Sequence, residues 1–303
     1  MSVLADSLGV PPEIETVAPT PKPPASVLRT SLKLWRMRIG LLLVLIIAFF
    51  AIVGPFIAPH SSTQPVGVDY APPGSPHALF GTDNLGQDIW SRFLDGGAPI
   101  LEIAIAATAL GVILGVVLGL LAAYSRNKLD DILMRSMDVI LAFPQIMLAL
   151  VAIATVGPKV WVIILAVGLT TAPRVARVAR GAALPVVERD FVAAAEALGV
   201  PRLKILTREL LPNILSPLMV EATLRLTYSI AVISGLAFLG LSTSADSPDW
   251  GSMINQNYIA FSYRPWGAGL PVLAIAVLTI GTGLIGDGIG RAAAGIDRVK
   301  ANE

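Results

Sequence analysis

Few residues in this sequence are of types that do chemistry, and they are scattered. The two histidines, His60 and His77, stand apart in one polar segment rather than in a cluster of metal ligands, and we interpret them as loop residues. No cysteine occurs, which excludes disulfides and thiolate ligands. Neither the phosphate-binding pattern G-x-x-x-x-G-K-[ST] nor the nucleophile pattern G-x-S-x-G is present. We therefore expect no catalytic site, no metal site and no cofactor bound by this chain.

Three ionisable residues stand inside or beside stretches that are otherwise apolar. Glu221 and Arg225 are four positions apart, and Glu102 precedes another apolar stretch. A charge inside a bilayer costs at least ~2.5 kcal/mol, so these residues need an explanation. Glu221 and Arg225 either neutralise each other as neighbours on one helix face or line a path through the membrane for a zwitterionic solute. Glu102 either lies at the membrane interface or belongs to the same path.

The elements that position these residues are long apolar runs. The chain of 303 residues is 54% hydrophobic and 14% charged, against about 25% charged in soluble domains. A membrane-spanning helix needs about 20 apolar residues. Gly157 and Pro158 indicate a turn, so 139–173 is predicted as a hairpin of two helices. Six spans of an all-α integral membrane protein are therefore predicted, at 39–58, 103–125, 139–158, 160–173, 214–241 and 265–286.

The sidedness of the basic residues predicts the orientation. With the N-terminus inside, eighteen of the 22 Lys and Arg residues fall in cytoplasmic segments, and only Arg92, Lys159 and Arg264 fall outside. Both termini are therefore expected in the cytoplasm. The predicted segments are a disordered Pro-rich tail at 1–30, a first transmembrane helix at 31–58, an extracytoplasmic loop at 59–97, a core at 98–291 and a cytoplasmic tail at 292–303.

The core contains a long cytoplasmic loop at about 174–212. It begins with Arg174, Arg177 and Arg180, continues with a short helix over 193–198, and turns at Gly199 and Pro201. A second short helix is expected over 203–211, before Pro212 opens the next span. Such a rigid bent element suits the transmission of force from a partner to the attached spans. On pattern alone, an ordinary cytoplasmic loop is the alternative.

This loop resembles the EAA loop of ABC-importer permeases, E-A-A-x-x-x-G followed by nine residues and I-x-L-P. Ala193 replaces the first Glu and Glu209 replaces the Ile, while Glu196 lies three residues beyond the missing carboxylate. Ala193 occupies the place of the first Glu, and the motif is matched in residue type at Ala194, Ala195, Gly199, Leu211 and Pro212.

The resemblance extends to the second permease of the dipeptide and oligopeptide import group, some of whose relatives carry nickel. Residues 81–92 read GTDNLGQDIWSR against the group's GTDxLGRDxxSR. Residues 130–144 resemble its D-x-x-L-M-R-x-x-D-x-x-L-A-F-P, with Asp130 or Asp131 in first place. Residues 238–241, 250–251 and 286–288 are similar to its FLGLG, SWG and GDG segments, so the matches run in order along the chain.

The resemblance implies a type I ABC importer permease fold in a bacterial plasma membrane. Implied partners are a second homologous permease, two ATPase subunits or domains that hold ATP and Mg, an extracytoplasmic substrate-binding protein, and a peptide substrate, with no nucleic acid. The ATPase-coupling loop would comprise Ala193, Ala194, Ala195, Glu196, Ala197, Leu198, Gly199, Val200, Glu209, Leu211 and Pro212. Binding-protein or gate contacts would be Asp83, Asp88, Arg92 and Trp250, and the translocation path would hold Glu221, Arg225 and Glu102.

Several alternatives remain open from the sequence. The same permease fold could import nickel or another small solute, and an ion-gradient-driven transporter or a membrane scaffold are rivals of another class. The outer loop would meet a binding protein, cap the pore, or act as a structural lid. Gly111, Gly115 and Gly119 recur every four residues and predict a close helix contact, either within the chain or with a paired permease.

Overall fold

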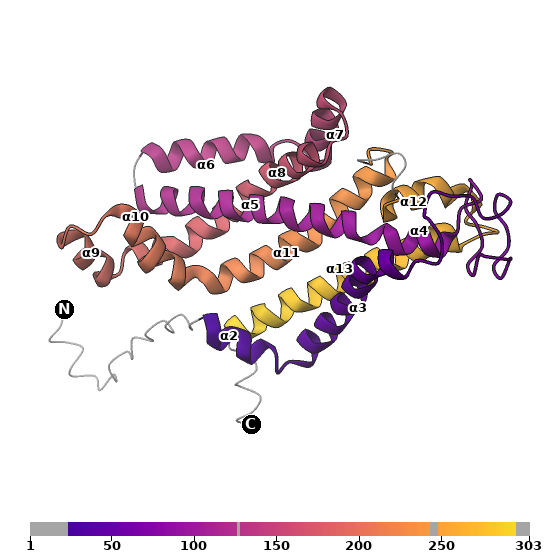
Figure 1. Cartoon of the computed structure of the whole chain (residues 1–303). Coiled ribbons are helices and arrows are strands. Elements are labelled where there is room, and N and C mark those ends of the chain that lie inside the picture. Colours follow the sequence, from indigo (N-terminus) through magenta and orange to yellow (C-terminus); the bar gives the residue numbers. More distant parts are fainter. Residues whose placement is uncertain (1–23, 126–127, 243–247, 295–303) are drawn as a thin grey trace, which may run out of the picture.

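The computed structural model describes residues 24–125, 128–242 and 248–294 of the chain (Figure 1). Within those ranges the regular structure is helical, apart from isolated bridges in the outer loop. The elements are α2 (Pro24–Ser31), α3 (Trp35–Ile57), α4 (Ile89–Asp95), α5 (Gly97–Ser125), α6 (Lys128–Leu141), α7 (Gln145–Val156), α8 (Val160–Val187), α9 (Asp190–Ala197), α10 (Arg202–Lys204), the π-helical η2 (Ile205–Leu210), α11 (Leu211–Phe238), α12 (Trp250–Asn257), the 3-10 helix η3 (Tyr258–Ala260) and α13 (Trp266–Ala294).

The membrane-spanning count is confirmed, with one change in shape. Among the described residues, five helices are long and apolar enough to span a membrane, and the pair α6 and α7 makes a sixth candidate that bends by 80°. The prediction of one straight helix over 139–158 is wrong. Pro144 lacks a backbone N–H and disfavours a helical Phe143, so α6 ends at Leu141 and α7 starts a new direction at Gln145.

Some predicted segment boundaries also need correction. Residues 24–30 were predicted as part of a disordered tail, but they belong to helix α2, whose Val27 packs against Ile289 and Ala292 of α13. Helix α13 continues to Ala294, past the predicted end of the core at 291. The loop predicted over 59–97 contains helix α4, which leads almost directly into α5. The rest of both predicted tails, 1–23 and 295–303, lies outside the described residues.

Glycines let two helix pairs approach closely. A Cβ added at Gly115 would lie 2.6 Å from the Ala172 carbonyl oxygen, and one at Gly119 would lie 2.5 Å from that of Ala176. The glycine-lined face of α5 therefore packs against α8 of the same chain, and the sequence alternative of a contact within the chain is the one observed. Helices α3 and α13 meet in the same way at Gly40 and Gly281.

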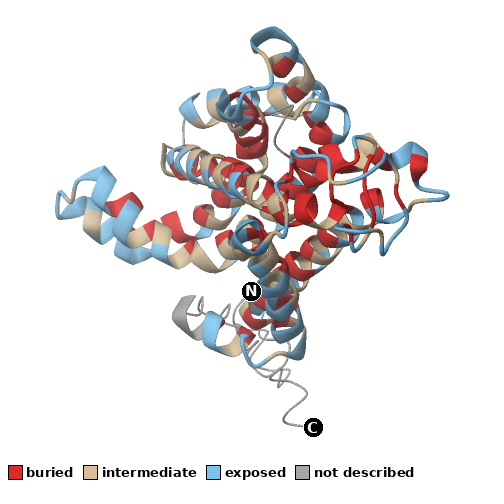
Figure 2. Cartoon of the chain, turned by 45° about the vertical axis from the view of Figure 1, so that its right-hand side comes forward, coloured by how far each residue is buried: buried red, intermediate tan, exposed pale blue. Residues whose placement is uncertain are grey.

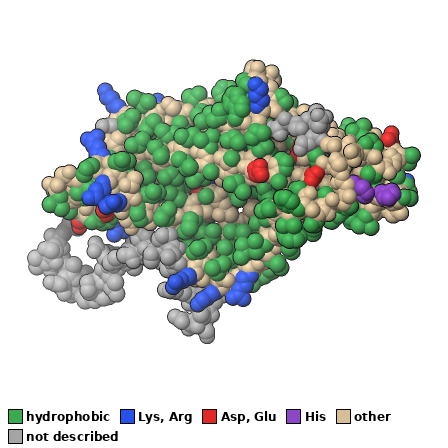
Figure 3. Space-filling model, viewed as in Figure 1, with side chains coloured by type: hydrophobic (Ala, Val, Ile, Leu, Met, Phe, Trp, Pro, Cys, Tyr) green, Lys and Arg blue, Asp and Glu red, His purple; other side chains and the backbone are tan. Residues whose placement is uncertain are grey.

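The bundle has two different ends (Figures 1 and 2). Helices α9 and α10 form an arm at one end, where Figure 2 shows mostly exposed residues, and the outer loop with α4 and α12 forms the other end. The start of α3 and the end of α13 lie together, with Arg36 and Asp287 3.5 Å apart. In Figure 3 a broad hydrophobic band covers the middle, whereas basic side chains gather near the α9 arm and the start of α3. The cytoplasmic placement of the termini stays a prediction.

Candidate functional site

The α9 arm is built on a turn that only a few residue types can make. Helix α8 ends at Val187, and α9 begins three residues later at Asp190. Gly199 then adopts a left-handed conformation with φ of 72°, which glycine accepts without strain. The Gly199 amide donates to the Glu196 carbonyl (2.9 Å) and the Val200 amide to the Ala195 carbonyl (3.0 Å). These bonds close the helix end and set the direction of the chain toward α10.

Helix α9 presents its motif residues to the surroundings. Val192 is 1% exposed and is the only residue of α9 classed as buried; it packs in a cluster with side chains of α5, α8, η2 and α11. The residues predicted to couple to an ATPase lie on the outside: Ala193, Ala194, Glu196, Ala197, Leu198 and Gly199 are exposed, and Ala195 and Val200 are half-buried. Glu196 also lines a cleft of about 540 Å³ between the arm and the inner ends of α5 and α6. One side of α9 is thus held and the other is free.

The second half of the predicted loop is not a separate helix. The stretch expected as a short helix over 203–211 is α10 and η2, which continue into α11 as one helix from Arg202 to Phe238. Ile205, Leu206 and Leu210 of η2 are buried against α5 and α8. Glu209 and Leu211 are half-buried on this continuous helix, and Pro212 is tolerated in the first turn of α11. A displacement of the arm therefore acts directly on α11.

The arginines before the arm bind helix α6 to helix α8. The Arg180 guanidinium donates two hydrogen bonds to the carboxylate of Asp130, both 2.6 Å long. Arg177 forms an ion pair with Asp138. Arg174, nearer the middle of α8, instead lies over the ring of Tyr228 of α11 at 5.3 Å. Two of the three basic residues that the sequence placed at a helix end therefore hold α6 in position.

At the opposite end of the bundle, the buried side chain of Asp83 holds the outer loop together. Its Oδ1 accepts hydrogen bonds from the amides of Leu85 and Gln87, both 2.9 Å. Its Oδ2 lies 3.0 Å from Arg92 Nη1, and Arg92 also donates to Gln256 of α12 (2.8 Å). Asp83 is 1% exposed and Arg92 4% exposed. The ion pair therefore ties the loop to α4 and α12.

Asp88 and Trp250 have comparable internal roles. Asp88 caps helix α4 by accepting from the amides of Trp90 and Ser91. The indole N–H of Trp250 donates to the Phe93 carbonyl (2.9 Å), and the two rings stack with centroids 5.6 Å apart. Both are also buried, so none of the four residues predicted as binding-protein or gate contacts presents its side chain at the surface. Their contact with a partner stays a prediction, and the geometry favours the structural alternative.

The loop also contains the two histidines and Tyr70, which is half-buried. His60 and His77, expected to stand apart, lie edge to face with ring centroids 5.8 Å apart. His60 Nδ1 is 3.7 Å from Asp88 Oδ2. Desolvation, with added repulsion from Tyr263 and nearby carboxylates, raises the pKa of the Tyr70 phenol. Among the described residues no group of three or more His, Asp or Glu is arranged to hold a metal ion.

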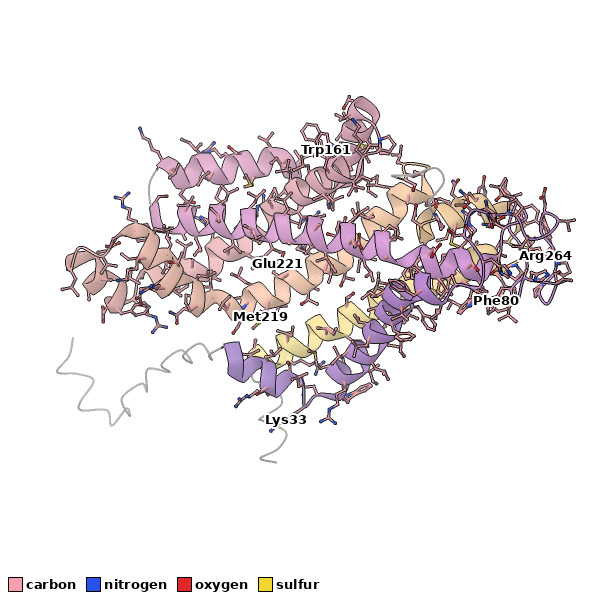
Figure 4. All side chains as sticks on the ribbon, in the orientation of Figure 1. Lys33, Phe80, Trp161, Met219, Glu221 and Arg264 are labelled. Atoms are coloured by element: carbon pink, nitrogen blue, oxygen red, sulfur yellow. The ribbon has the colours of Figure 1, made fainter. Side chains whose placement is uncertain are left out.

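The charged pair in α11 is an ion pair. Glu221 Oε1 and Arg225 Nε are 2.8 Å apart without hydrogen-bond alignment, and both side chains are largely buried. Figure 4 shows Glu221 about midway along the bundle. The two charges therefore neutralise each other, as predicted for neighbours on one helix face. Glu102 on α5 is exposed and lies near the outer end of that helix. Whether any of the three residues meets a solute stays a prediction.

Comparison with known proteins identifies the family. Residues 115–294 match the family described as binding-protein-dependent transport system inner membrane component, and residues 37–73 match the N-terminal TM domain of oligopeptide transport permease C. A putative peptide transport system permease protein of Brucella suis is 40% identical over 256 residues, which are 83% of this chain and 85% of the relative. The chain belongs to the binding-protein-dependent transport permease family. It is an inner-membrane permease subunit of a bacterial ABC importer.

Other relatives agree with this membership, and a solved structure shares the fold. A di/tripeptide transport system permease protein of Pseudomonas aeruginosa is 34% identical over 82% of this permease and 84% of the relative. A glutathione transport system permease protein of Escherichia coli is 35% identical over 82% of each chain. The fold resembles that of the MetNI methionine ABC transporter in an inward-facing conformation, with a TM-score of 0.53 and 19% identity over 68% of this permease and 96% of that chain.

Sequence reasoning missed several residues of this permease that the structure brings into view. The carboxylates of Asp130 and Asp138 are the partners of Arg180 and Arg177, but nothing in either segment identifies a partner 39 or 50 positions away. Phe191, Leu198 and Leu203 are apolar and exposed on the arm, at 41%, 83% and 71%. Of these, only Leu198 falls inside the predicted motif. An apolar residue in a basic, polar segment is the signal that could have indicated the other two.

Proposed function

We propose that this permease imports di- or oligopeptides. It would form half of the translocation pathway together with a second homologous permease. Two partner ATPase subunits would bind and hydrolyse ATP with Mg, and an extracytoplasmic binding protein would deliver the substrate. The chain itself would bind no cofactor. Support for the substrate class comes from the relatives, which are named as peptide, di/tripeptide and glutathione permeases.

The observation that carries the coupling role is the exposed motif surface of α9. Phe191, Leu198 and Leu203 expose apolar side chains on a polar arm, where burial against a partner would gain about 25 cal/mol per Å² of apolar surface. The small side chains of Ala193, Ala194 and Ala197 leave the helix backbone open to a close contact. A groove on an ATPase that accepts a short helix would fit this surface.

The connections of the arm explain how such a contact would move the permease. Only two residues separate α9 from α8, and the arm runs through α10 and η2 into α11 without a break. A partner that grips α9 would therefore pull on two membrane helices together. Because α5 is packed on α8 through Gly111, Gly115 and Gly119, it would move with them. This arrangement supports alternating access by rocking of packed helices.

A pair of glycine substitutions tests the coupling role. Gly199 and Gly240 both have positive φ, 72° and 83°, both close a helix end with the same pair of backbone hydrogen bonds, and an added Cβ would meet nothing within 4 Å at either site. Alanine at either position therefore adds a similar backbone strain, about 1–2 kcal/mol, but only Gly199 shapes the arm. The complex would be reconstituted with its ATPases and binding protein, and substrate-stimulated ATP hydrolysis and peptide import would be measured.

G199A is expected to lower both stimulated hydrolysis and import roughly 5- to 30-fold, the factor that this strain corresponds to. G240A, in the turn that follows α11, serves as the matched control and should stay near wild type. Equal activity of the two variants would show that the turn at Gly199 is not part of coupling.

A further inference from the structure

An arginine in the middle of helix α8 lacks an acidic partner. Arg177 and Arg180, on the same helix, are paired with Asp138 and Asp130 of α6. Within the described part of the chain, Arg174 forms no ion pair and donates no hydrogen bond, and its guanidinium carbon lies 5.3 Å from the centre of the Tyr228 ring. Arg174 therefore holds an uncompensated positive charge.

The depth of Arg174 makes that charge costly. Helix α8 runs from Val160 to Val187, so Arg174 lies about 20 Å from either end at 1.5 Å per residue. The same helix passes the length and hydropathy requirements of a membrane span. An arginine at such a depth faces a protein partner or a water-filled path, because contact with lipid costs at least ~2.5 kcal/mol.

The neighbouring charges do not compensate Arg174. Glu221 is engaged by Arg225 on α11, at 2.8 Å. The acidic residue of α5, Glu102, lies nine residues outward from Gly111, the position that packs against α8 beside Thr171. On α6, Asp130 and Asp138 are engaged by the other two arginines, and Asp131 lies one residue from Asp130 at the inner start of that helix. The surroundings of Arg174 and Tyr228 are therefore net positive.

Tyr228 leaves the donors of Arg174 available. A guanidinium that lies over an aromatic ring is attracted through its face, while its N–H groups at the edge stay free for hydrogen bonds. Those N–H groups match the two oxygens of a carboxylate. Tyr228 is itself 41% exposed, so this pair reaches the surface of the helix bundle rather than its core.

We propose that Arg174, positioned by Tyr228, binds the carboxylate of the transported solute at the middle of helix α8. The proposal rests on the proposed import function, in which a second permease completes the pathway around this surface. A di- or oligopeptide carries such a carboxylate at its C-terminus. The Arg174 site thus predicts that the solute carries an anionic group. It is a contact for the solute that is separate from the Glu221 and Arg225 pair.

The test compares two probes, Ala-Ala and its C-terminal amide, in proteoliposomes that contain the whole transporter and its binding protein. Each variant's import rate is divided by the wild-type rate for the same probe, which removes any preference of the binding protein. R174Q should lower import of the free acid at least about tenfold and import of the amide less than about threefold. R177Q is the matched control, since it removes the same charge one turn away, and should affect both probes alike. Y228F, which keeps the ring, should resemble wild type, whereas Y228L should follow R174Q.

Two results would overturn the proposal. An equal loss of both probes in R174Q would assign Arg174 a structural role. If the second permease is lost during purification of R174Q, the partner of Arg174 is a carboxylate of that second permease and not the solute. If wild-type protein imports neither probe, the dipeptide part of the proposed function is wrong. ATP hydrolysis that the binding protein stimulates distinguishes that outcome from a failed reconstitution.

Discussion

Substitutions of Leu198 and Val192 distinguish a residue that contacts an ATPase from a residue that holds the arm in place. Leu198 is 83% exposed at the end of α9, and Val192 is 1% exposed on its opposite side. Full burial of a leucine side chain is worth about 1.5–3 kcal/mol. Because Leu198 begins 83% exposed, its burial by an ATPase would contribute about 1.2–2.5 kcal/mol. The substitution L198A should therefore raise the dissociation constant of the ATPase roughly 8- to 70-fold, without destabilising the permease.

V192A should behave in the opposite way. It removes two buried methyl groups at about 0.8 kcal/mol each, together with the cost of the cavity left behind. The unfolding temperature of the purified permease should fall, because Val192 joins the arm to the cluster formed by α5, α8, η2 and α11. If V192A binds the ATPase more weakly, the cause should be the loosened arm. A lipid or partner that stabilises the permease should then restore part of the ATPase binding.

The assay is a titration of the detergent-solubilised permease pair with its ATPase, alongside thermal unfolding of each variant. L85A is the control, since Leu85 is a 53% exposed leucine in the outer loop at the other end of the molecule. If L198A binds the ATPase as tightly as L85A does, Leu198 is no contact residue and the docking surface has been placed wrongly.

Two further predictions concern the packing that supports these sites. G115A should lower the free energy of unfolding by about 1–3 kcal/mol, and the unfolding temperature with it, because its Cβ would lie 2.5 Å from Val175 Cβ. G235A is the control and should be neutral, because its Cβ would meet nothing within 4 Å. Equal unfolding temperatures of the two variants would contradict the close contact of α5 with α8. D83N should break the buried ion pair with Arg92, at a cost of about 3–5 kcal/mol, and expose the outer loop to added protease. The exposed D69N is its control, and unchanged cleavage of D83N would refute the role of Asp83 as the organiser of the loop.

Local signals were sufficient for much of the fold and for the centre of the candidate coupling site. The charge-free runs marked the membrane helices, because hydropathy over about 20 residues is a property of the segment itself. The turn after α9 was likewise predictable from Gly199 and Pro201, since the left-handed conformation and the missing N–H are properties of those two residues. The spacing of the motif placed the exposed helix directly before this turn.

Features that depend on distant partners were decided only by the tertiary structure. The sequence predicted contacts for Asp83, Asp88, Arg92 and Trp250 at the surface, but their side chains are enclosed by segments that close over them from α4, α12 and the outer loop. It also predicted a free second helix in the inner loop, whereas burial of Ile205 and Leu210 against α5 and α8 joins that stretch to α11.

The charges show the same division. From the sequence alone, the arginines of α8 formed one basic series of three residues. In the folded chain, two of them meet carboxylates of α6 and the third, Arg174, meets only Tyr228. Which charge is compensated depends on the approach of another helix, and that approach is set by the glycine contacts of α5 with α8 and by the bend at Pro144. The sequence alone thus determined that this is a membrane permease with a turn at Gly199, whereas the packing of distant helices decided which of its charged side chains have an acidic partner.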